Sequence, residues 1–358
     1  MTQVDPIYSE IAAKMNQADS KATPRLLQKI ASMEQARIMR ELPNTAEEIA
    51  SALALDKATV EKQLQYLYER GVVTPGRPAW NLVTNKVLLK DFIGSANSKY
   101  NDDELLDLAR EMSLEDPTSQ AERLKRGESV PIRQGMRVVP KWRSIEDIPG
   151  VLPIEDIREI FRNNSPIVVH NCPCRAVYRN RPCKDDVPVD ACIGAGRSGQ
   201  RQIERNTGGR ELSYDELIAL LDKLDESPIV TLTGNSDRMP SSICSCCPDC
   251  CGNFIRTSYI KPLSGQLSYA KSRFIVEHNP EACHACGICT SDRCPVNAIT
   301  MKYFPEFDGE RSYTDTEECI GCGLCVVSCP NEARKMKLVR PVEHIPTAPS
   351  MFDFGPPI

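Results

Sequence analysis

The chain has 358 residues, enough for two or three domains, and its apolar fraction of 41% suffices for packed cores. Its net charge of −5 gives no support to a strongly basic nucleic-acid binder, although a local basic patch stays open. No apolar run approaches the roughly 20 residues of a membrane span. Because no secretory signal is visible at the N-terminus either, we expect a cytoplasmic protein.

Residues 1–100 carry the pattern of three short helices and a hairpin. The apolar spacing in TPRLLQKIASMEQARIMREL predicts a first helix, which Pro43 ends. Thr45 and Glu48 have the spacing of a capping box and predict the start of a second. DKATVEKQLQYLYERGVV predicts a third helix closed by Gly71, and TPGRPAWNLV predicts a turn and a short β wing. One face of the third helix should be buried through Val60, Leu64 and Leu67.

This order of elements resembles a winged helix-turn-helix of the MarR and ArsR type, through the pattern EEIASALAL…ATVEKQLQYLYERGVV. The resemblance implies a fold more than a function. Such a fold could dock on a partner protein or read DNA, which needs donors on the third helix. Glu61 and Glu69 place negative charges among the donors of this helix, so the sequence favours docking on a protein over binding DNA. The candidate donors are Lys57, Lys62, Gln63, Gln65, Arg70 and, in the wing turn, Arg77.

Residues 101–127 are predicted to connect two domains. DDELLDLAREM should form a short amphipathic helix, and LEDPTSQAERLKRGES should be polar and exposed.

Residues 128–262 alternate predicted strands and helices. After a β-rich start, LPIEDIREIFRNN predicts a helix and SPIVVHN a buried strand that leads into a first group of cysteines. Further along, SYDELIALLDKLDES predicts a helix, and the strand PIVTLTGN leads into a second cysteine group. This alternation predicts an α/β domain whose two strand ends bring their cysteine loops together. Between them, IGAGRSGQRQ is glycine-rich, but we expect no strand–helix context of a dinucleotide site there.

Residues 263–340 contain an internal repeat of two cysteine runs, CxxCxxCx4CP and CxxCxxCx3CP, with Gly287 and Gly323 at matching places. The second run has the spacing of bacterial ferredoxins with two [4Fe–4S] clusters, and the first has one extra residue before its last cysteine. Zinc, the competing metal, favours paired CxxC knuckles. In the ferredoxin pattern the fourth cysteine of each run ligates the other cluster. The predicted ligand sets are Cys283, Cys286, Cys289 and Cys329 for one cluster, and Cys319, Cys322, Cys325 and Cys294 for the other.

Two flanking features complete this region. The linker between the runs, which includes PEFDGERSYT, should form an extra hairpin or loop. The tail, residues 341–358, is rich in proline and is expected to be extended.

All seventeen cysteines lie from position 172 onward, and a disulfide scaffold is the alternative to metal binding. Such scaffolds are small and belong to oxidising compartments, whereas this chain is long and has an odd cysteine count. Nine cysteines precede the repeat and are predicted to hold one or two more iron–sulfur clusters, with zinc as an alternative. Either each group of cysteines binds its own cluster, or one cluster draws ligands from both. The nine are Cys172, Cys174, Cys183, Cys192, Cys244, Cys246, Cys247, Cys250 and Cys251.

The pattern NCPCR…C…C…GGRELSYDEL…ICSCCPDCC resembles a family of anaerobic iron–sulfur proteins with a ferredoxin domain, often placed beside oxidoreductases. The resemblance covers roughly residues 135–335 and implies electron transfer without naming a substrate.

We therefore expect a multidomain α+β protein: a winged helix (1–100), a linker helix (101–127), a cysteine-rich α/β domain (128–262), a ferredoxin-like domain (263–340) and an extended tail (341–358). The expected function is electron transfer, more as a subunit of an anaerobic oxidoreductase complex than as a stand-alone enzyme. The redox partner and the oligomeric state stay open. The alternatives are a redox-sensing transcription regulator, and a reductase with substrate chemistry at the middle cysteines.

Overall fold

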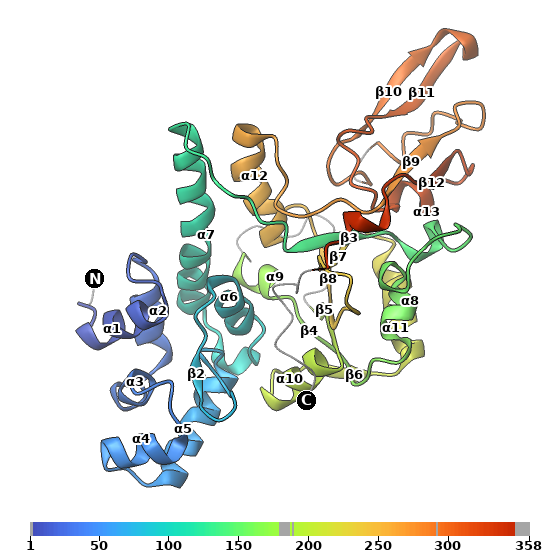
Figure 1. Ribbon diagram of the computed structural model, residues 1–358. Coiled ribbons are helices and arrows are strands. Elements are labelled where there is room, and N and C mark those ends of the chain that lie inside the picture. Colours follow the sequence, from blue (N-terminus) through green and yellow to red (C-terminus); the bar gives the residue numbers. More distant parts are fainter. Residues whose placement is uncertain (1–2, 179–186, 188–189, 291–292, 348–358) are drawn as a thin grey trace. The chain divides into compact units, whose positions relative to one another are not determined.

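The structure is a computed structural model that describes residues 3–178, 187, 190–290 and 293–347 (Figure 1). It contains both helices and sheets, in agreement with the predicted α+β class. The described residues divide into two compact units. Unit 1 comprises 3–123 with two further segments, 170–178 and 201–210, and unit 2 comprises the remaining described residues. None of the described helices is both long enough and apolar enough to cross a membrane.

Unit 1 begins with five helices and a two-stranded antiparallel hairpin. The capping box at Thr45 is present, and Gly71 ends the third helix of the predicted trio with a φ of +84°. The single helix predicted before Pro43 is wrong, because Ala31 is extended and Ser32 caps a new helix in a capping box with Gln35. The elements are α1 Pro6–Lys14, α2 Thr23–Ile30, α3 Met33–Arg40, α4 Ala46–Leu53, α5 Lys57–Glu69, β1 Val73–Thr74 and β2 Asn81–Leu82.

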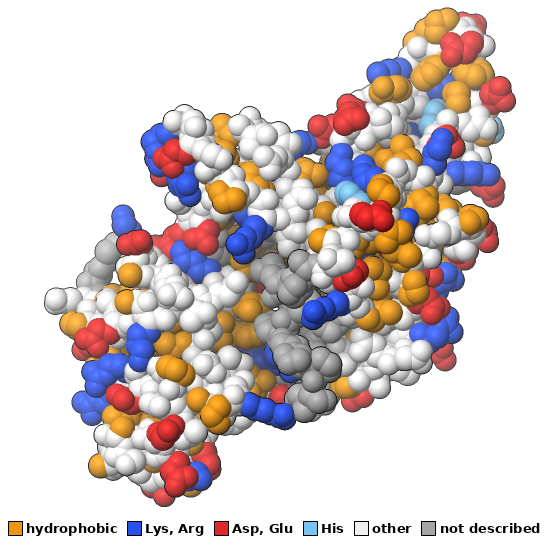
Figure 2. Space-filling view, viewed as in Figure 1, with side chains coloured by type: hydrophobic (Ala, Val, Ile, Leu, Met, Phe, Trp, Pro, Cys, Tyr) orange, Lys and Arg blue, Asp and Glu red, His pale blue; other side chains and the backbone are white. Residues whose placement is uncertain are grey.

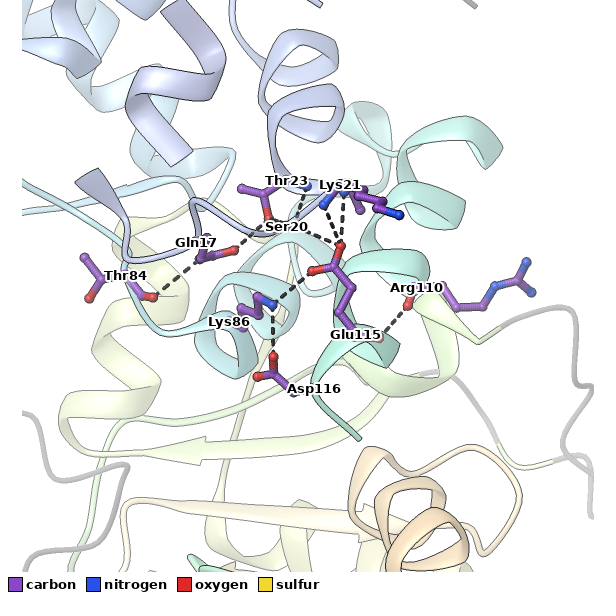
Figure 3. Close-up of polar contacts among 11 residues, drawn as sticks. Gln17, Ser20, Lys21, Thr23, Thr84, Lys86, Arg110, Glu115 and Asp116 are labelled. Carbon is purple, nitrogen blue, oxygen red and sulfur yellow. Dashed lines mark hydrogen bonds and ion pairs between the residues drawn. The ribbon is translucent and has the colours of Figure 1, made fainter. Parts of the chain in front are cut away.

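The helix predicted within residues 101–127 is longer than the sequence suggested. It runs as α7, Asp103–Lys125, and continues through Pro117, which is buried together with Ala121. Its polar second half is not simply exposed: the Glu115 carboxylate accepts hydrogen bonds from Ser20, Lys21, Ala22 and Lys86 (Figure 3). The remaining elements of unit 1 are α6 Lys86–Gly94, η1 Ser98–Tyr100 and α9 Pro173–Val177; α10 Arg197–Glu204 ends in this unit.

Unit 2 is built on a six-stranded sheet of order β3-β7-β8-β5-β4-β6. The pairs β3–β7, β7–β8 and β5–β8 are antiparallel. The strands are β3 Met136–Val139, β4 Ile167–Asn171, β5 Asp190–Ala195, β6 Arg210–Leu212, β7 Val230–Gly234 and β8 Ser242–Cys246. The helices beside them are η2 Trp142–Ser144, η3 Pro153–Glu155, α8 Ile157–Arg162, α11 Tyr214–Leu224 and α12 Gly252–Ser264.

The two faces of this sheet have different partners. On one face, Ile193 and Ile243 pack with residues of α8 and α11 in a helix-covered core. On the other face, Leu232 and Cys246 pack with Phe254 of α12 and with residues 320–324 of the ferredoxin-like part. Since successive residues of a strand point to opposite faces, alternate residues of β8 reach the second core.

The ferredoxin-like part contains two antiparallel strand pairs, β9–β12 and β10–β11. An extra hairpin or loop is predicted between the cysteine runs, and the second pair is a hairpin there, which projects from the rest of this part in Figure 1. The elements are β9 Phe274–His278, β10 Ile299–Phe304, η4 Pro305–Phe307, β11 Gly309–Thr314, α13 Leu324–Val327, β12 Arg334–Leu338 and η5 Val342–His344.

The glycine-rich stretch corrects one expectation, because it spans the end of strand β5 and the first part of α10. The context of a dinucleotide fingerprint is therefore present. The glycines nevertheless serve packing within the protein: a Cβ on Gly199 would lie 2.3 Å from the Pro166 carbonyl oxygen. The amide of Gly196 donates to that same oxygen over 3.1 Å. These contacts explain the glycines without a nucleotide.

Candidate iron–sulfur sites

The second cysteine run lines a pocket whose empty space, including the solvent at its opening, is about 330 Å³. Two of its cysteines come from the loop that leads into α13, the third lies in α13 itself, and the fourth comes from the end of the first run. The structure thus brings together Cys319, Cys322, Cys325 and Cys294. The rest of the wall is largely apolar and includes Val276, Val296 and Ile299.

The first run lines a pocket of similar size, about 280 Å³. It contains the crossed set Cys283, Cys286, Cys289 and Cys329, with His284 also in the wall. Two pockets of similar size, each with three cysteines from one run and one from the other, have the arrangement that paired cubane clusters require.

Glycine lets both loops wrap around their pockets. Gly287 has a φ of +75° and Gly323 a φ of +77°, in the left-handed region that other residues seldom adopt. A Cβ on Gly323 would also lie 2.2 Å from the hydroxyl of Ser144. The matching glycines in the two runs are therefore a requirement of backbone geometry.

Backbone and side-chain donors reach the sulfurs. The amide of Ala298 donates to Cys294 Sγ over 3.1 Å, and Cys283 Sγ lies 3.5 Å from Ser312 Oγ. The Ser312 hydroxyl is also 3.1 Å from His278 Nε2. Burial, together with the charge of Arg334, lowers the pKa of His278 to about 4, so this imidazole is neutral at pH 7.

Arg334 provides a buried cation beside both pockets. Its side chain lines the first pocket, while its Nη1 lies 4.0 Å from Cys325 Sγ of the second and donates to Thr314 Oγ1 over 2.8 Å. Nη2 is buried and has no hydrogen-bond partner among the described residues. An unpartnered buried donor of this kind is costly unless an acceptor is bound. Anionic clusters with sulfide acceptors fit these residues.

Burial also raises the pKa of thiols in the second set. For Cys322, burial is the largest cause and raises the pKa to about 12; donation from the Leu324 amide opposes it, and the neighbouring Cys319 and Cys294 add smaller increases. Thiolates are the ligand form, so metal binding there must release protons.

Five middle cysteines fall into two groups. Cys244 and Cys246 lie in strand β8 rather than in the loop that the sequence predicted, and Cys251 caps α12. The Sγ atoms of Cys246 and Cys251 are 3.2 Å apart, and Cys246 also hydrogen-bonds Cys244. Cys247 and Cys250 instead pack with Val187, Ala191, Leu224 and Ile229 in a separate core.

The adjacent Cys246 and Cys247 thus lie in different cores. The ligand atoms of Cys247, Asp249 and Cys250 lie within 4.8 Å of one another, a spacing that could hold a metal ion. Cys192 is directly opposite Cys244 in the β5–β8 register and therefore points to the same face as Cys244 and Cys246.

Two further predicted ligands lie in unit 1. Cys172 caps α9, and Cys174 accepts a hydrogen bond from Lys90 Nζ over 3.0 Å. Lys90 is buried and pairs with Asp91 over 2.6 Å. Cys183 lies outside the described residues. All the cysteines that the structure describes are free of disulfide bonds.

Sequence reasoning missed three residues near the sulfurs: Lys90, Tyr269 and Arg334. Their partners lie outside the reach of a local pattern: Lys90 and Cys174 are 84 residues apart, and Arg334 and Thr314 are 20 residues apart.

Residues 312–335 match the family of 4Fe-4S binding domains, and this segment contains the complete second cysteine run. An uncharacterised protein of Methanothermobacter thermautotrophicus is 37% identical over 60 residues, which is 16% of this chain and 11% of that protein. UacF of Escherichia coli, whose name suggests an oxidoreductase, is 41% identical over 54 residues, 14% of this chain and 7% of UacF. The chain thus spans about a tenth or less of these relatives. No solved structure matches the chain.

Proposed function

We propose that this chain is an iron–sulfur electron-transfer protein, or such a subunit of an anaerobic oxidoreductase complex, with two ferredoxin-type [4Fe–4S] clusters and at least one more. The observation that carries the proposal is the pair of cysteine pockets in a segment related to 4Fe-4S binding domains. When bound, each cluster accepts or releases one electron.

The chain's own residues hold and tune these groups. The crossed ligand sets fix both clusters to one fold, so that neither run can bind its cluster without the other. Arg334 offsets negative charge at both pockets, and the amide of Ala298 donates to Cys294. Apolar walls around the second pocket exclude water. These features are the usual means by which a protein sets a cluster potential.

Docking on a redox partner is the role we propose for the winged-helix-like part of unit 1. The candidate DNA donors of α5 are largely engaged within the unit: Gln63 with Gln35, and Gln65 with the Glu204 carbonyl. Arg70 lies over the rings of Tyr66 and Tyr100. Figure 2 shows acidic and basic side chains interspersed over α3 to α5 on the face drawn. These observations support docking over a transcription regulator.

Iron analysis of the anaerobically purified chain tests the proposal. We expect about twelve irons per chain or more; about eight would support the two ferredoxin clusters alone, and about four or fewer would contradict even those.

The crossed ligation has a sharper test. Cys329→Ala should remove the same electron paramagnetic resonance signal as Cys286→Ala, and Cys294→Ala the same signal as Cys322→Ala. Ser328→Ala is the matched control, since its hydroxyl bonds the Leu324 carbonyl within α13 and it should keep both signals. If Cys329→Ala removed the signal that Cys322→Ala removes, the crossed assignment would be wrong.

A further inference from the structure

One sheet face of unit 2 gathers four cysteines from three separate segments. Cys192 comes from β5, Cys244 and Cys246 from β8, and Cys251 from the start of α12. Alternation along β8 and direct pairing with β5 place the first three on one face. A tight turn, closed by the Cys251 amide and the Cys247 carbonyl over 3.1 Å, returns Cys251 to the same face.

Three of these cysteines are buried, and two of the sulfurs are in contact. Cys246 Sγ is 3.2 Å from Cys251 Sγ, and Cys192, Cys246 and Cys251 are each less than a tenth exposed. Asn253 Nδ2 lies 3.8 Å from Cys251 Sγ, which gives this sulfur a further donor. Four thiols on one face, most of them buried, are the donor set of a tetrahedral zinc site or of an iron–sulfur cluster.

Tyr269 is an independent sign that something accepts a hydrogen bond here. Its side chain is fully buried and packs on Phe254, with ring centroids 5.0 Å apart. Its hydroxyl is within electrostatic reach of Cys246, Cys251 and Cys322, yet has no hydrogen-bond partner among the described residues. Buried tyrosine hydroxyls usually find a partner. A sulfur of a bound cluster would supply one.

We propose that Cys192, Cys244, Cys246 and Cys251 are the ligands of a third [4Fe–4S] cluster, and that the Tyr269 hydroxyl donates a hydrogen bond to one of its sulfurs. The assignment rests on the proposed electron-transfer function and deepens it. Iron is favoured over zinc because Cys246 and Cys251 share one buried core with Cys322, a predicted ligand of the second ferredoxin cluster. The spacing Cys244-x-Cys246 also differs from the CxxC knuckle of zinc sites.

The test uses the full chain, purified anaerobically and reconstituted with iron and sulfide. Cys246→Ala should lose about four irons relative to the unmodified chain and keep both ferredoxin signals. Cys192→Ala should likewise lose about four irons and keep both ferredoxin signals. This variant tests the ligand assignment if the Cys246 variant fails to fold. Ser245→Ala, next along β8 and on the opposite face, should keep the full iron content.

Three results would overturn the assignment: unchanged iron in both cysteine variants, release of zinc instead of iron, or loss of the same signal from Cys250→Ala. Failure of the wider proposal looks different, because the unmodified chain would then lack the ferredoxin signals as well. Tyr269→Phe should keep all the iron and make the midpoint potential of the third signal more negative. An unchanged potential would remove Tyr269 from the proposal.

Discussion

Glu115 links three segments of unit 1, and its replacement tests how much one half-buried carboxylate stabilises that unit. One carboxylate oxygen accepts from Ser20 Oγ at 3.0 Å, the Lys21 amide at 3.0 Å and the Ala22 amide at 3.1 Å (Figure 3). The other accepts from Lys86 Nζ at 2.9 Å. The carboxylate therefore fixes the start of α2 and the start of α6 against α7.

Two substitutions separate charge from hydrogen bonding. Glu115→Gln can keep the acceptor for the three donors near Ser20 but places an amide against the Lys86 ammonium. A hydrogen bond to a charged group contributes about 1.5–3 kcal/mol, and partial exposure of this pair favours the lower end, about 1.5 kcal/mol. Glu115→Ala also leaves the Lys21 and Ala22 amides without their acceptor, at about 1 kcal/mol each, whereas the Ser20 hydroxyl can still donate to Thr23 Oγ1, so we expect a total loss of about 3–4 kcal/mol.

Hydrogen exchange of peptides covering residues 17–30 and 84–92 measures these losses locally. A loss of about 1.5 kcal/mol corresponds to roughly tenfold faster exchange. The matched control is Glu111→Gln, one turn earlier on α7, whose partner Arg25 is about half exposed, so that its loss should be below about 0.5 kcal/mol. Equal effects at positions 111 and 115 would refute the reasoning.

The pH dependence gives a second check of Glu115. Burial would raise the pKa of Glu115, but hydrogen bonds from Lys86, Ser20 and Ala22 outweigh it and lower the pKa from its usual 4.5. A lowered folded-state pKa means that the stabilisation is complete above the usual value of 4.5 and is lost as the pH falls through the lowered value. The difference in stability between the unmodified chain and the Glu115→Gln variant should therefore shrink in acid, and a constant difference would contradict the linkage.

The remaining predictions concern the cysteine sites and α5. In potentiometric titrations, Arg334→Gln should shift the potential of at least one ferredoxin cluster by about −100 mV. A charge about 6 Å away contributes about 3 kcal/mol at an effective dielectric constant of about 20. The control Lys337→Gln removes an exposed charge and should shift neither potential. Lys90→Met should speed hydrogen exchange in α6 by at least about a hundredfold. The substitution removes the buried cation that faces Asp91 and Cys174, at a cost of about 3 kcal/mol. Unchanged exchange would contradict this role of Lys90. Gel-shift titrations at low salt should show no DNA binding, and binding that weakens steeply with salt would revive the regulator hypothesis.

Local patterns predicted much of unit 1 because many of its elements depend on neighbouring residues alone. The capping box at Thr45, the buried face of α5 and the glycine stop at Gly71 all depend on residues within one or two turns. The length of α7 could not be predicted in the same way. Its polar side chains receive partners such as Ser20 that are 95 residues away, and a local pattern counts them as exposed.

The cysteines of the repeat and those of the middle region differ in the same way, since local spacing determines the first and contacts between distant segments determine the second. In the repeat, the spacing itself carries the loop geometry, so the two runs predict which cysteines could share a pocket, and the structure brings those sets together. In the middle region the spacing is uninformative, because Cys244 and Cys246 are ordered by the alternation of β8, a strand that the sequence did not reveal. Cys192 joins them only through the β5–β8 register, across about 50 positions of the chain.

Strand alternation also bears on why five cysteines are crowded between positions 244 and 251. A cubane cluster takes four thiolates, so five cysteines cannot all ligate one cluster. In the structure, Cys244, Cys246 and Cys251 pack in the core that contains Cys322, and Cys247 and Cys250 pack in a separate core. The adjacent cysteines therefore belong to two separate groups at one strand end: the first shares a core with Cys322, and the second lies with Asp249 in a group whose spacing could hold a metal ion.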